Sequence, residues 1–222
     1  MCGRFYIPEV DDTPEELMAI LTQLESRMQL SQPGFALKRG EICPGDTAAV
    51  IAMNRKRQPS VFAMRWGFQV TTASPQETAQ SYEQLAIPGL EPQPKRSTRL
   101  VFNARSESAM VKPLFRESMR LRRCLIPAAA YFEWDHTHDD RAKYRFSLRQ
   151  RDTMYLAGLY RLSDDDRAEF TILTREATSA LARFHDRMPV IADSVSTRYL
   201  DPGEEPQLLL DAPCDALCWV RA

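Results

Sequence analysis

A chain of 222 residues can bury one substantial core, and its 44% hydrophobic and 27% charged residues are ordinary for a soluble globular protein. No apolar run approaches the roughly 18 residues of a membrane span, the N-terminus lacks the apolar core of a signal peptide, and a net charge of -1 alone predicts no nucleic-acid partner. Five irregularly spaced cysteines argue against a disulfide framework, so we expect one intracellular domain over residues 1–222 with reduced thiols.

The first part of the chain predicts a strand followed by one helix. Residues 4–7 are strand-like, and Thr13-Pro14-Glu15-Glu16 has the pattern of a capping box with proline at the first helical position. Apolar residues then recur at helical spacing until Gln32-Pro33-Gly34, where the pattern stops. This amphipathic helix should pack on the core.

A hairpin and a long connection follow. Residues 48–53 and 60–66 predict two β-strands around the polar turn 54–57, whose three cations could contact phosphate, although an exposed hairpin tip explains them more simply. Residues 71–98 are polar, contain four prolines and show no sustained period. We expect a long loop there, flanking a binding face.

The second half of the chain predicts many short strands and a few helices. The expected strands are residues 100–102, 123–134, 144–148, 154–160, 169–174 and 188–191, and the expected helices are residues 113–119, 177–184 and a segment that begins at a Ser194 cap and ends at Leu200. This order indicates an α+β fold with a curled, mostly antiparallel and barrel-like sheet core and a few flanking helices.

Charge is concentrated in one part of the sequence. Residues 95–123 contain nine basic and two acidic side chains, a local charge of +7 that leaves -8 for the rest of the chain. Such a segment can present a basic face to phosphate groups, and a solvated arginine surface would produce the same pattern.

The N-terminus offers unusual chemistry. Removal of Met1, which a small following residue permits, would leave Cys2 with a free amine and a thiol that together can close a five-membered ring on an aldehyde. Both groups titrate close enough to neutral pH to react there. The alternative is a cysteine that stands by chance on a frayed terminus.

Three further polar residues lie among apolar neighbours. Glu133 stands between Phe132 and Trp134, where burial would raise its pKa and suit it to proton transfer, or it pairs with an arginine. His185 is suited to proton transfer or is a structural histidine. Asn103 follows an apolar strand and can orient an amine or a hydroxyl, or it forms a turn.

The other two histidines lie with three aspartates in residues 135–140. The pattern could suggest a metal site, but its position between two strands is better explained by a solvated hairpin turn. Cys214 and Cys218 lack further ligands nearby. We therefore expect no metal.

Seven separated motifs resemble the SOS-response-associated peptidase (SRAP) family, which includes proteins that shield abasic sites in single-stranded DNA. In order, they are MCGRF at residues 1–5, RWGF at 65–68, FNARSES at 102–108, RRCLIPAAAYFEW at 122–134, AGLY at 157–160, TILTREA at 171–177 and FHDRMPVI at 184–191. The resemblance covers nearly the whole chain, and the joint match is far more specific than any single motif.

The resemblance implies a covalent mechanism. The amine of Cys2 would attack the ring-opened aldehyde of an abasic deoxyribose to give an imine, and its thiol would add to that imine to close a thiazolidine that links protein to DNA. Glu133 would assist ring opening and proton transfer. His185 would act on the sugar hydroxyl or the imine, and Asn103 would hold the Cys2 terminus.

The resemblance also implies how DNA is held. Backbone phosphates would be bound by Arg4, Arg105 and Arg187, while flanking bases would meet the apolar surfaces of Pro44, Trp66 and Trp134. The implied partner is single-stranded DNA containing abasic sites, bound by a monomer that uses no cofactor.

Three features depart from the family pattern. Asparagine and alanine usually precede the proline that here is Pro44, a proline and a tryptophan usually follow residues 65–68, and the common valine- and asparagine-containing tail is missing at Ala222. Two other functions stay open. One is a thiol peptidase that removes its own first residue or cleaves other proteins, with Cys2 as nucleophile and His185 or Glu133 as base, and the other is a non-catalytic reader of single-stranded or modified DNA.

Overall fold

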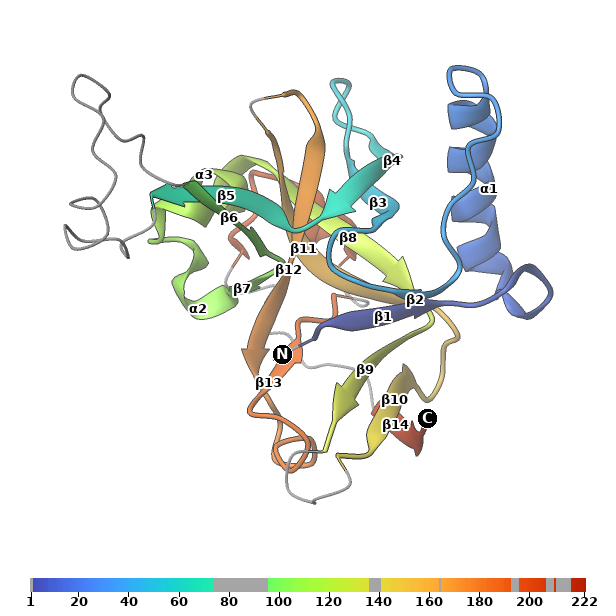
Figure 1. Ribbon diagram of the computed structural model, residues 1–222, viewed down its shortest axis with the longest axis vertical. Coiled ribbons are helices and arrows are strands. Elements are labelled where there is room, and N and C mark those ends of the chain that lie inside the picture. The colour runs from blue at the N-terminus through green and yellow to red at the C-terminus, as the bar shows by residue number, and fades with distance from the viewer. Residues whose placement is uncertain are drawn as a thin grey trace, which may run out of the picture.

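Two curled sheets, a short β-ribbon and a few helices make up the protein in a computed structural model (Figure 1). The structure describes residues 2–73, 96–135, 141–163, 165–192, 196–206, 210 and 217–222. The expected α+β class with a mostly antiparallel, curled sheet core is confirmed.

The larger sheet is a ring of strands. Its order is β11-β8-β3-β4-β12-β13, with β7 also on β12, and a further pairing of β11 with β12 closes the ring. The strands are β3 (Thr47–Met53), β4 (Pro59–Trp66), β7 (Asn103–Arg105), β8 (Arg123–Ala128), β11 (Met154–Leu162), β12 (Ala168–Glu176) and β13 (Arg187–Pro189). Only β12 makes parallel pairings, with β4 and β7.

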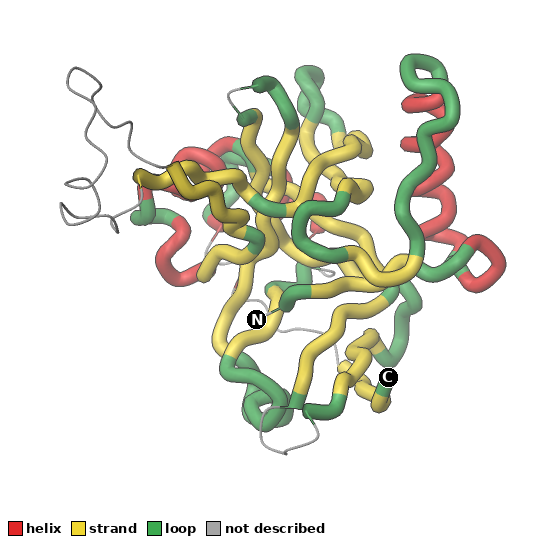
Figure 2. Tube along the Cα trace, viewed as in Figure 1, coloured by secondary structure: helices red, strands yellow, loops and turns green. Residues whose placement is uncertain are grey.

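The smaller sheet holds both ends of the described chain. Its order is β14-β10-β9-β1-β2, all antiparallel, from β1 (Arg4–Ile7), β2 (Gly40–Ile42), β9 (Ala130–Trp134), β10 (Lys143–Leu148) and β14 (Leu217–Arg221). In Figures 1 and 2 this sheet lies below the ring, and β1 runs along the boundary between the two.

The predicted strand at residues 123–134 is in fact two strands in different sheets. Ala129 separates them, because its backbone N–H donates to the Tyr6 carbonyl at 2.9 Å instead of continuing either ladder. β8 therefore stays in the ring while β9 crosses to β1, with Phe5 opposite Tyr131. This crossing carries Glu133 toward the N-terminus.

The long helix α1 (Glu15–Gln29) is confirmed, with Leu17, Leu21 and Leu24 buried on one face. The capping box is wrong. The Thr13 hydroxyl donates to the carbonyls of Pro8 and Glu9 at 3.0 and 2.7 Å, so it does not cap the helix, which begins one residue after Pro14. A 3₁₀ turn, η1 (Val10–Asp12), precedes it.

The hairpin of β3 and β4 and the helix α3 (Pro113–Leu121) are as predicted, and the short helix α2 (Ser106–Ala109) was not foreseen. The expected loop at residues 71–98 begins and ends as a ribbon, β5 (Phe68–Ala73) with β6 (Arg96–Val101), and residues 74–95 lie outside the described part.

The helix predicted at residues 177–184 is wrong, because this segment is a series of tight turns in which the Thr178 carbonyl accepts from both Leu181 and Ala182. Phe184 anchors the turns in the core, with its ring 5.1 Å from that of Phe146. The helix that ends at Leu200 is present as α4 (Ser196–Leu200), and its predicted cap Ser194 lies outside the described residues.

The described helices include none that is long and apolar enough to cross a membrane. Cys2, Cys43, Cys124 and Cys218, the cysteines that the structure describes, are all free thiols.

Candidate active site

Cys2 and Asn103 meet where the two sheets join. Asn103 opens β7, which runs parallel to β12 in the ring, and its Nδ2 donates to the Cys2 carbonyl at 2.8 Å. Within the described residues the Asn103 Oδ1 is buried and accepts no hydrogen bond. An unsatisfied buried acceptor costs about 1–3 kcal/mol, so this oxygen is ready to accept a hydrogen bond from an amine or a hydroxyl.

Glu133 reaches the same place from the smaller sheet. Arg4 lies opposite Phe132, so the next step of the antiparallel register brings Glu133 alongside the residues just before β1. Its side chain is buried, and this burial raises the pKa of the Glu133 carboxyl. Glu133 therefore holds a proton more readily than an exposed carboxyl does.

Cys2 itself is completely buried, which differs from the exposed terminus expected of a reactive aminothiol. Burial, and after it the negative charge of Glu133, raises the pKa of the Cys2 thiol well above its ordinary value. Because Met1 precedes Cys2 in the sequence, the Cys2 nitrogen is a peptide nitrogen until that residue is removed. Met1 lies outside the described residues.

His185 lies in the turns before β13 and is partly buried. Its Nδ1 is 2.9 Å from the backbone nitrogen of Arg187 and 2.5 Å from Oδ1 of Asp186. The first contact needs a lone pair on Nδ1 and the second needs a proton, so the two suit opposite protonation states of the ring. The Asp186 charge also raises the pKa of Glu133, which ties this turn electrostatically to the same site.

The three arginines expected to hold phosphates differ in availability. Arg4 is 43% exposed and pairs with Glu41 at 2.6 Å. Arg105 is exposed and forms no ion pair with another described residue.

Arg187 is only 11% exposed, and Glu107 holds it through two hydrogen bonds of 2.7 and 2.9 Å. Its Nη2 also donates to the Thr174 carbonyl at 2.6 Å. The Arg187 guanidinium is therefore already bound to Glu107 and Thr174, and a phosphate would have to displace Glu107 to reach it.

Trp66 corrects one prediction. Its side chain is completely buried, its ring centroid lies 5.1 Å from that of Phe5, and its Nε1 donates to the Phe102 carbonyl at 2.9 Å. It therefore has no surface to offer a base, and it instead forms the core behind β1.

Trp134 and Pro44 are both partly exposed. Trp134 lies under two cations, with the Arg4 guanidinium 5.3 Å and the Lys143 ammonium 5.7 Å from its ring. Pro44 stands in the turn between β2 and β3. Both offer the apolar surface that contact with a base would need.

The basic segment is also less uniform than its sequence suggests. Arg123 is buried and donates to the carbonyls of Asp201 and Glu204, while Arg122 pairs with Glu117 at 2.9 Å. The exposed cations that form no ion pair with another described residue are Arg99, Arg105, Lys112, Arg116 and Arg120. Lys95 and the side chain of Arg96 lie outside the described part.

Sequence reasoning missed the two carboxylates that hold arginines here. Glu107 lies inside the FNARSES motif but was counted only as a charge, and Glu41 stands in no motif. Their partners are 80 and 37 residues away in the chain, a separation that no local pattern reveals.

The described residues contain no group of three or more histidine, cysteine, aspartate or glutamate side chains placed to bind a metal ion. The turn at residues 136–140, with its two histidines, lies outside them.

The sequence matches the family described as SOS response associated peptidase (SRAP) over residues 1–219. The abasic site processing protein YobE of Bacillus subtilis is 34% identical over 126 residues, which cover 52% of this chain and 57% of that protein. The abasic site processing protein YMR114C of Saccharomyces cerevisiae is 31% identical over 49% of this chain and 27% of that protein. The abasic site processing protein HMCES of Xenopus tropicalis is 23% identical over 52% and 42%. These matches thus span about half of this chain and no more than 57% of each of these relatives.

Two solved structures share the fold. A protein from Bacteroides thetaiotaomicron superposes with a TM-score of 0.69 at 17% identity, over 99% of this chain and 91% of that one. A protein from Bordetella bronchiseptica superposes with a TM-score of 0.66 at 21% identity, over 100% and 99%. At such identities the likeness establishes the fold alone.

Proposed function

This chain belongs to the SOS response associated peptidase (SRAP) family, and from that premise we propose that it captures abasic sites in single-stranded DNA by a covalent bond to Cys2, as part of a DNA damage response. The observation that supports this most directly is the meeting of Cys2 with Asn103 and with the buried Glu133. The names of the relatives, abasic site processing proteins, agree with it.

The proposed reaction begins after removal of Met1. The Cys2 amine attacks the aldehyde carbon of the opened sugar, and loss of water from the adduct gives an imine. The sulfur of Cys2 then attacks the imine carbon while its proton passes to nitrogen, which closes the thiazolidine ring. Water is the only product released.

Each neighbouring side chain has a role in this sequence. Glu133, whose pKa is raised by burial, donates a proton during sugar opening and loss of water, and takes one back. Asn103 fixes Cys2 through its carbonyl, and its unsatisfied Oδ1 accepts from the amine. His185 acts on the sugar hydroxyl or on the imine.

Arg4 and Arg105 would hold backbone phosphates beside this site, and Trp134 and Pro44 would contact the neighbouring bases. Phosphate contacts fix the position of the strand without reading its sequence. Selectivity for damage would then come from the aldehyde.

The state of the Cys2 thiol favours this reaction over a thiol peptidase. A cysteine nucleophile attacks as the thiolate, whereas burial and the Glu133 charge raise the pKa of this thiol. In the proposed reaction the amine attacks first, and the thiol is needed only to close the ring. A strand-cleaving lyase activity could follow from the same imine.

The test uses trimmed protein, verified by intact mass, and an oligonucleotide with one abasic site. We expect an adduct that survives heating on a denaturing gel. Cys2→Ser keeps the amine but cannot form a thiazolidine, so its adduct should require trapping by borohydride. Asn103→Ala should slow adduct formation.

The alternatives predict different results. A peptidase would give no heat-stable adduct, and mass spectrometry would show cleaved protein instead. A non-catalytic reader would bind abasic DNA equally well as Cys2→Ala and form no covalent species. Either result would overturn the proposal.

A further inference from the structure

A groove lies at the end of the strand ring away from Cys2. It has a volume of about 670 Å³ and lies between the turn that joins β3 to β4 and the adjoining ends of β11 and β12. Figures 1 and 2 show both hairpins projecting upward side by side above the ring, far from the N-terminus.

The floor of the groove is apolar. Its apolar lining residues are Ala52, Met53, Phe62, Met64, Tyr160, Leu162 and Ala168, and Leu162 is 58% exposed. Methionine side chains adapt to the shape of what they contact, and exposed apolar surface gathered in a groove is typical of an interaction site.

The rim of the groove is cationic. Arg55 and Lys56 are exposed and form no ion pair with another described residue, and Arg27 holds its guanidinium 5.4 Å from the Phe62 ring. The described residues that line the groove include no aspartate or glutamate.

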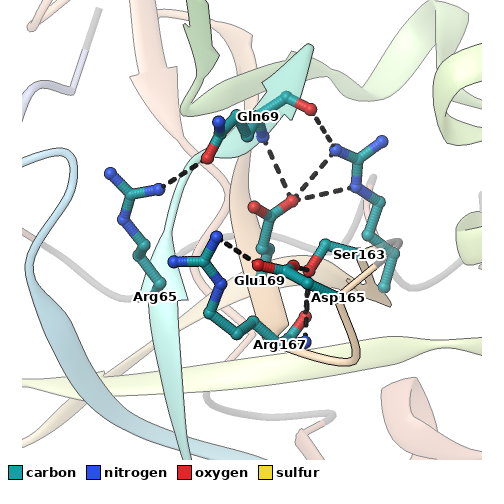
Figure 3. A network of polar contacts seen from close by, with 7 residues as sticks. Arg65, Gln69, Ser163, Asp165, Arg167 and Glu169 are labelled. Carbon is teal, nitrogen blue, oxygen red and sulfur yellow. Dashed lines mark hydrogen bonds and ion pairs between the residues drawn. The ribbon is translucent and has the colours of Figure 1, made fainter. Parts of the chain in front are cut away.

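The turn of the neighbouring hairpin has two described aspartates, Asp165 and the exposed Asp166, and neither lines the groove. Asp165 is paired with Arg167 and accepts a hydrogen bond from Ser163 at 2.5 Å (Figure 3). It lines a separate pocket together with Gln69 and Glu169, on the side where the buried Glu169 accepts from the Gln69 backbone at 3.1 Å.

We propose that this groove binds a short acidic segment of another protein, which inserts a large apolar side chain between the two hairpins while its carboxylates pair with Arg55 and Lys56. The flexible side chains of Met53, Met64 and Leu162 can adapt to such a side chain, and the rings of Phe62 and Tyr160 add apolar contact surface. The guanidinium of Arg27 already lies over the Phe62 ring.

The groove and the proposed DNA site can be occupied together. β4 carries Phe62 at the groove and Trp66 in the core behind β1, and four residues of strand separate them by about 13 Å. A partner in the groove would therefore be held beside the captured DNA without covering Cys2. The proposal does not depend on the chemistry at Cys2.

Fluorescence anisotropy of the full chain with a labelled peptide tests this. The peptide carries aspartates on both sides of a central Phe-Leu pair, and a second peptide has glycines in place of that pair. We expect the first to bind at least tenfold more tightly, and Leu162→Asp to weaken it at least tenfold. Arg55→Glu with Lys56→Glu should weaken it several-fold and reduce its salt dependence.

Leu121→Asp is the matched control, because Leu121 is 57% exposed on α3 and lies outside the groove. It should leave peptide binding unchanged, and the groove variants should leave the yield of abasic DNA adduct unchanged. The proposal is overturned if the peptide fails to bind at millimolar concentration or if Leu121→Asp acts like Leu162→Asp. It is also overturned if the two cation reversals weaken binding of undamaged single-stranded DNA but not of the peptide.

Discussion

The ionised form of Glu133 opposes folding. Its carboxyl is buried, and this burial raises its pKa in the folded protein above the ordinary value near 4.3. The folded state therefore binds this proton more tightly than the unfolded state does. Stability falls as the pH rises from the unfolded value through the raised folded value, and it stays lower above that.

Glu133→Gln should consequently raise Tm at pH 7 to 8 and leave it unchanged near pH 4. Each kcal/mol corresponds to about 2–4 °C for a chain of this size. The same change should slow adduct formation about 100-fold, the lower range for loss of a general acid. Thermal unfolding across this pH range and a timed gel measure the two effects.

Glu205→Gln is the control for the Glu133 experiment, because Glu205 is exposed and should give little change in either measurement. If Glu133→Gln instead lowers Tm at every pH, the carboxylate stabilises the fold through its partners and its burial does not mark a functional site.

In the proposed function, Glu107 would compete with a backbone phosphate for Arg187. The Arg187 guanidinium donates to both oxygens of Glu107, which holds the pKa of this carboxyl below its usual range. Glu107→Gln should weaken that grip, so affinity for undamaged single-stranded DNA should rise several-fold in a binding titration. Glu117→Gln offers a matched control, since it weakens the ion pair between Glu117 on α3 and Arg122, which directly follows the helix.

The ion pair of Arg187 with Glu107 predicts a pH dependence of folding stability opposite in sign to that of Glu133. The pKa of Glu107 is lowered in the folded protein. Its contribution to folding stability is therefore fully present above the unfolded-state pKa of about 4.3, and it is lost as the pH falls through the lower folded-state pKa. Glu107 is half exposed, so its loss should cost about 1 kcal/mol or less at pH 7. If Glu107→Gln leaves DNA affinity unchanged and lowers the adduct yield, the ion pair between Glu107 and Arg187 instead positions the turn that carries His185.

At the scale of the elements, Gly158 of β11 is closely enclosed by the neighbouring strands. A Cβ added there would lie 2.6 Å from Ile126 Cδ1 and 2.7 Å from the Thr171 carbonyl, since β8 and β12 pair on either side. Gly158→Ala should destabilise the protein by about 1–3 kcal/mol, measured by denaturant unfolding. Gly203→Ala meets nothing closer than 3.4 Å and should change stability little. Equal stabilities would show that the ring is loosely packed at this point.

Elements with a strong local pattern could be predicted from the sequence, and those that depend on distant partners could not. α1 follows from its apolar period, and the hairpin of β3 and β4 follows from two β-type runs around a polar turn. The split of residues 123–134 depends on the Tyr6 carbonyl, more than 100 residues away. The turns at residues 177–184 replace a helix because Phe184 packs against Phe146 and Trp219, which no local propensity records.

The candidate site, too, could be predicted from the sequence only in part. The candidate residues Cys2, Asn103 and Glu133 stand in motifs and could be proposed from the sequence, and the structure brings the side chain of Asn103 to the Cys2 carbonyl. Motif position does not report burial, however. Trp66 lies in a motif and belongs to the core, and Arg187 lies in a motif but is held by Glu107.

At the scale of the whole molecule, the two sheets meet at the start of β1. The smaller sheet supplies Glu133 through β9, and the ring supplies Asn103 through β7. Asn103 lies on the same strand as the exposed Arg105, which ends β7. Three more exposed cations follow on and beside α3, and together with Arg105 they are called the cation path: Lys112, Arg116 and Arg120. A DNA strand at Cys2 would thus find cations along one direction from the site.

This path predicts how DNA binding responds to salt. Each phosphate contact to single-stranded DNA contributes about 0.7 to the slope of log affinity against log salt concentration. Lys112→Gln with Arg116→Gln should therefore reduce the slope by about 1.4 if both contact phosphate. Titrations of an undamaged oligonucleotide at several salt concentrations measure this without crosslinking.

Arg198→Gln is the control for the salt titration, because Arg198 pairs with Glu204 at 2.8 Å on α4 and lies outside the path. Its slope should match that of the unmodified chain. If the double variant also keeps that slope, the strand leaves Cys2 in another direction. The remaining contacts would then have to come from Arg4 and its neighbours on the smaller sheet, because Arg4 and Lys143 are the cations beside Trp134 there.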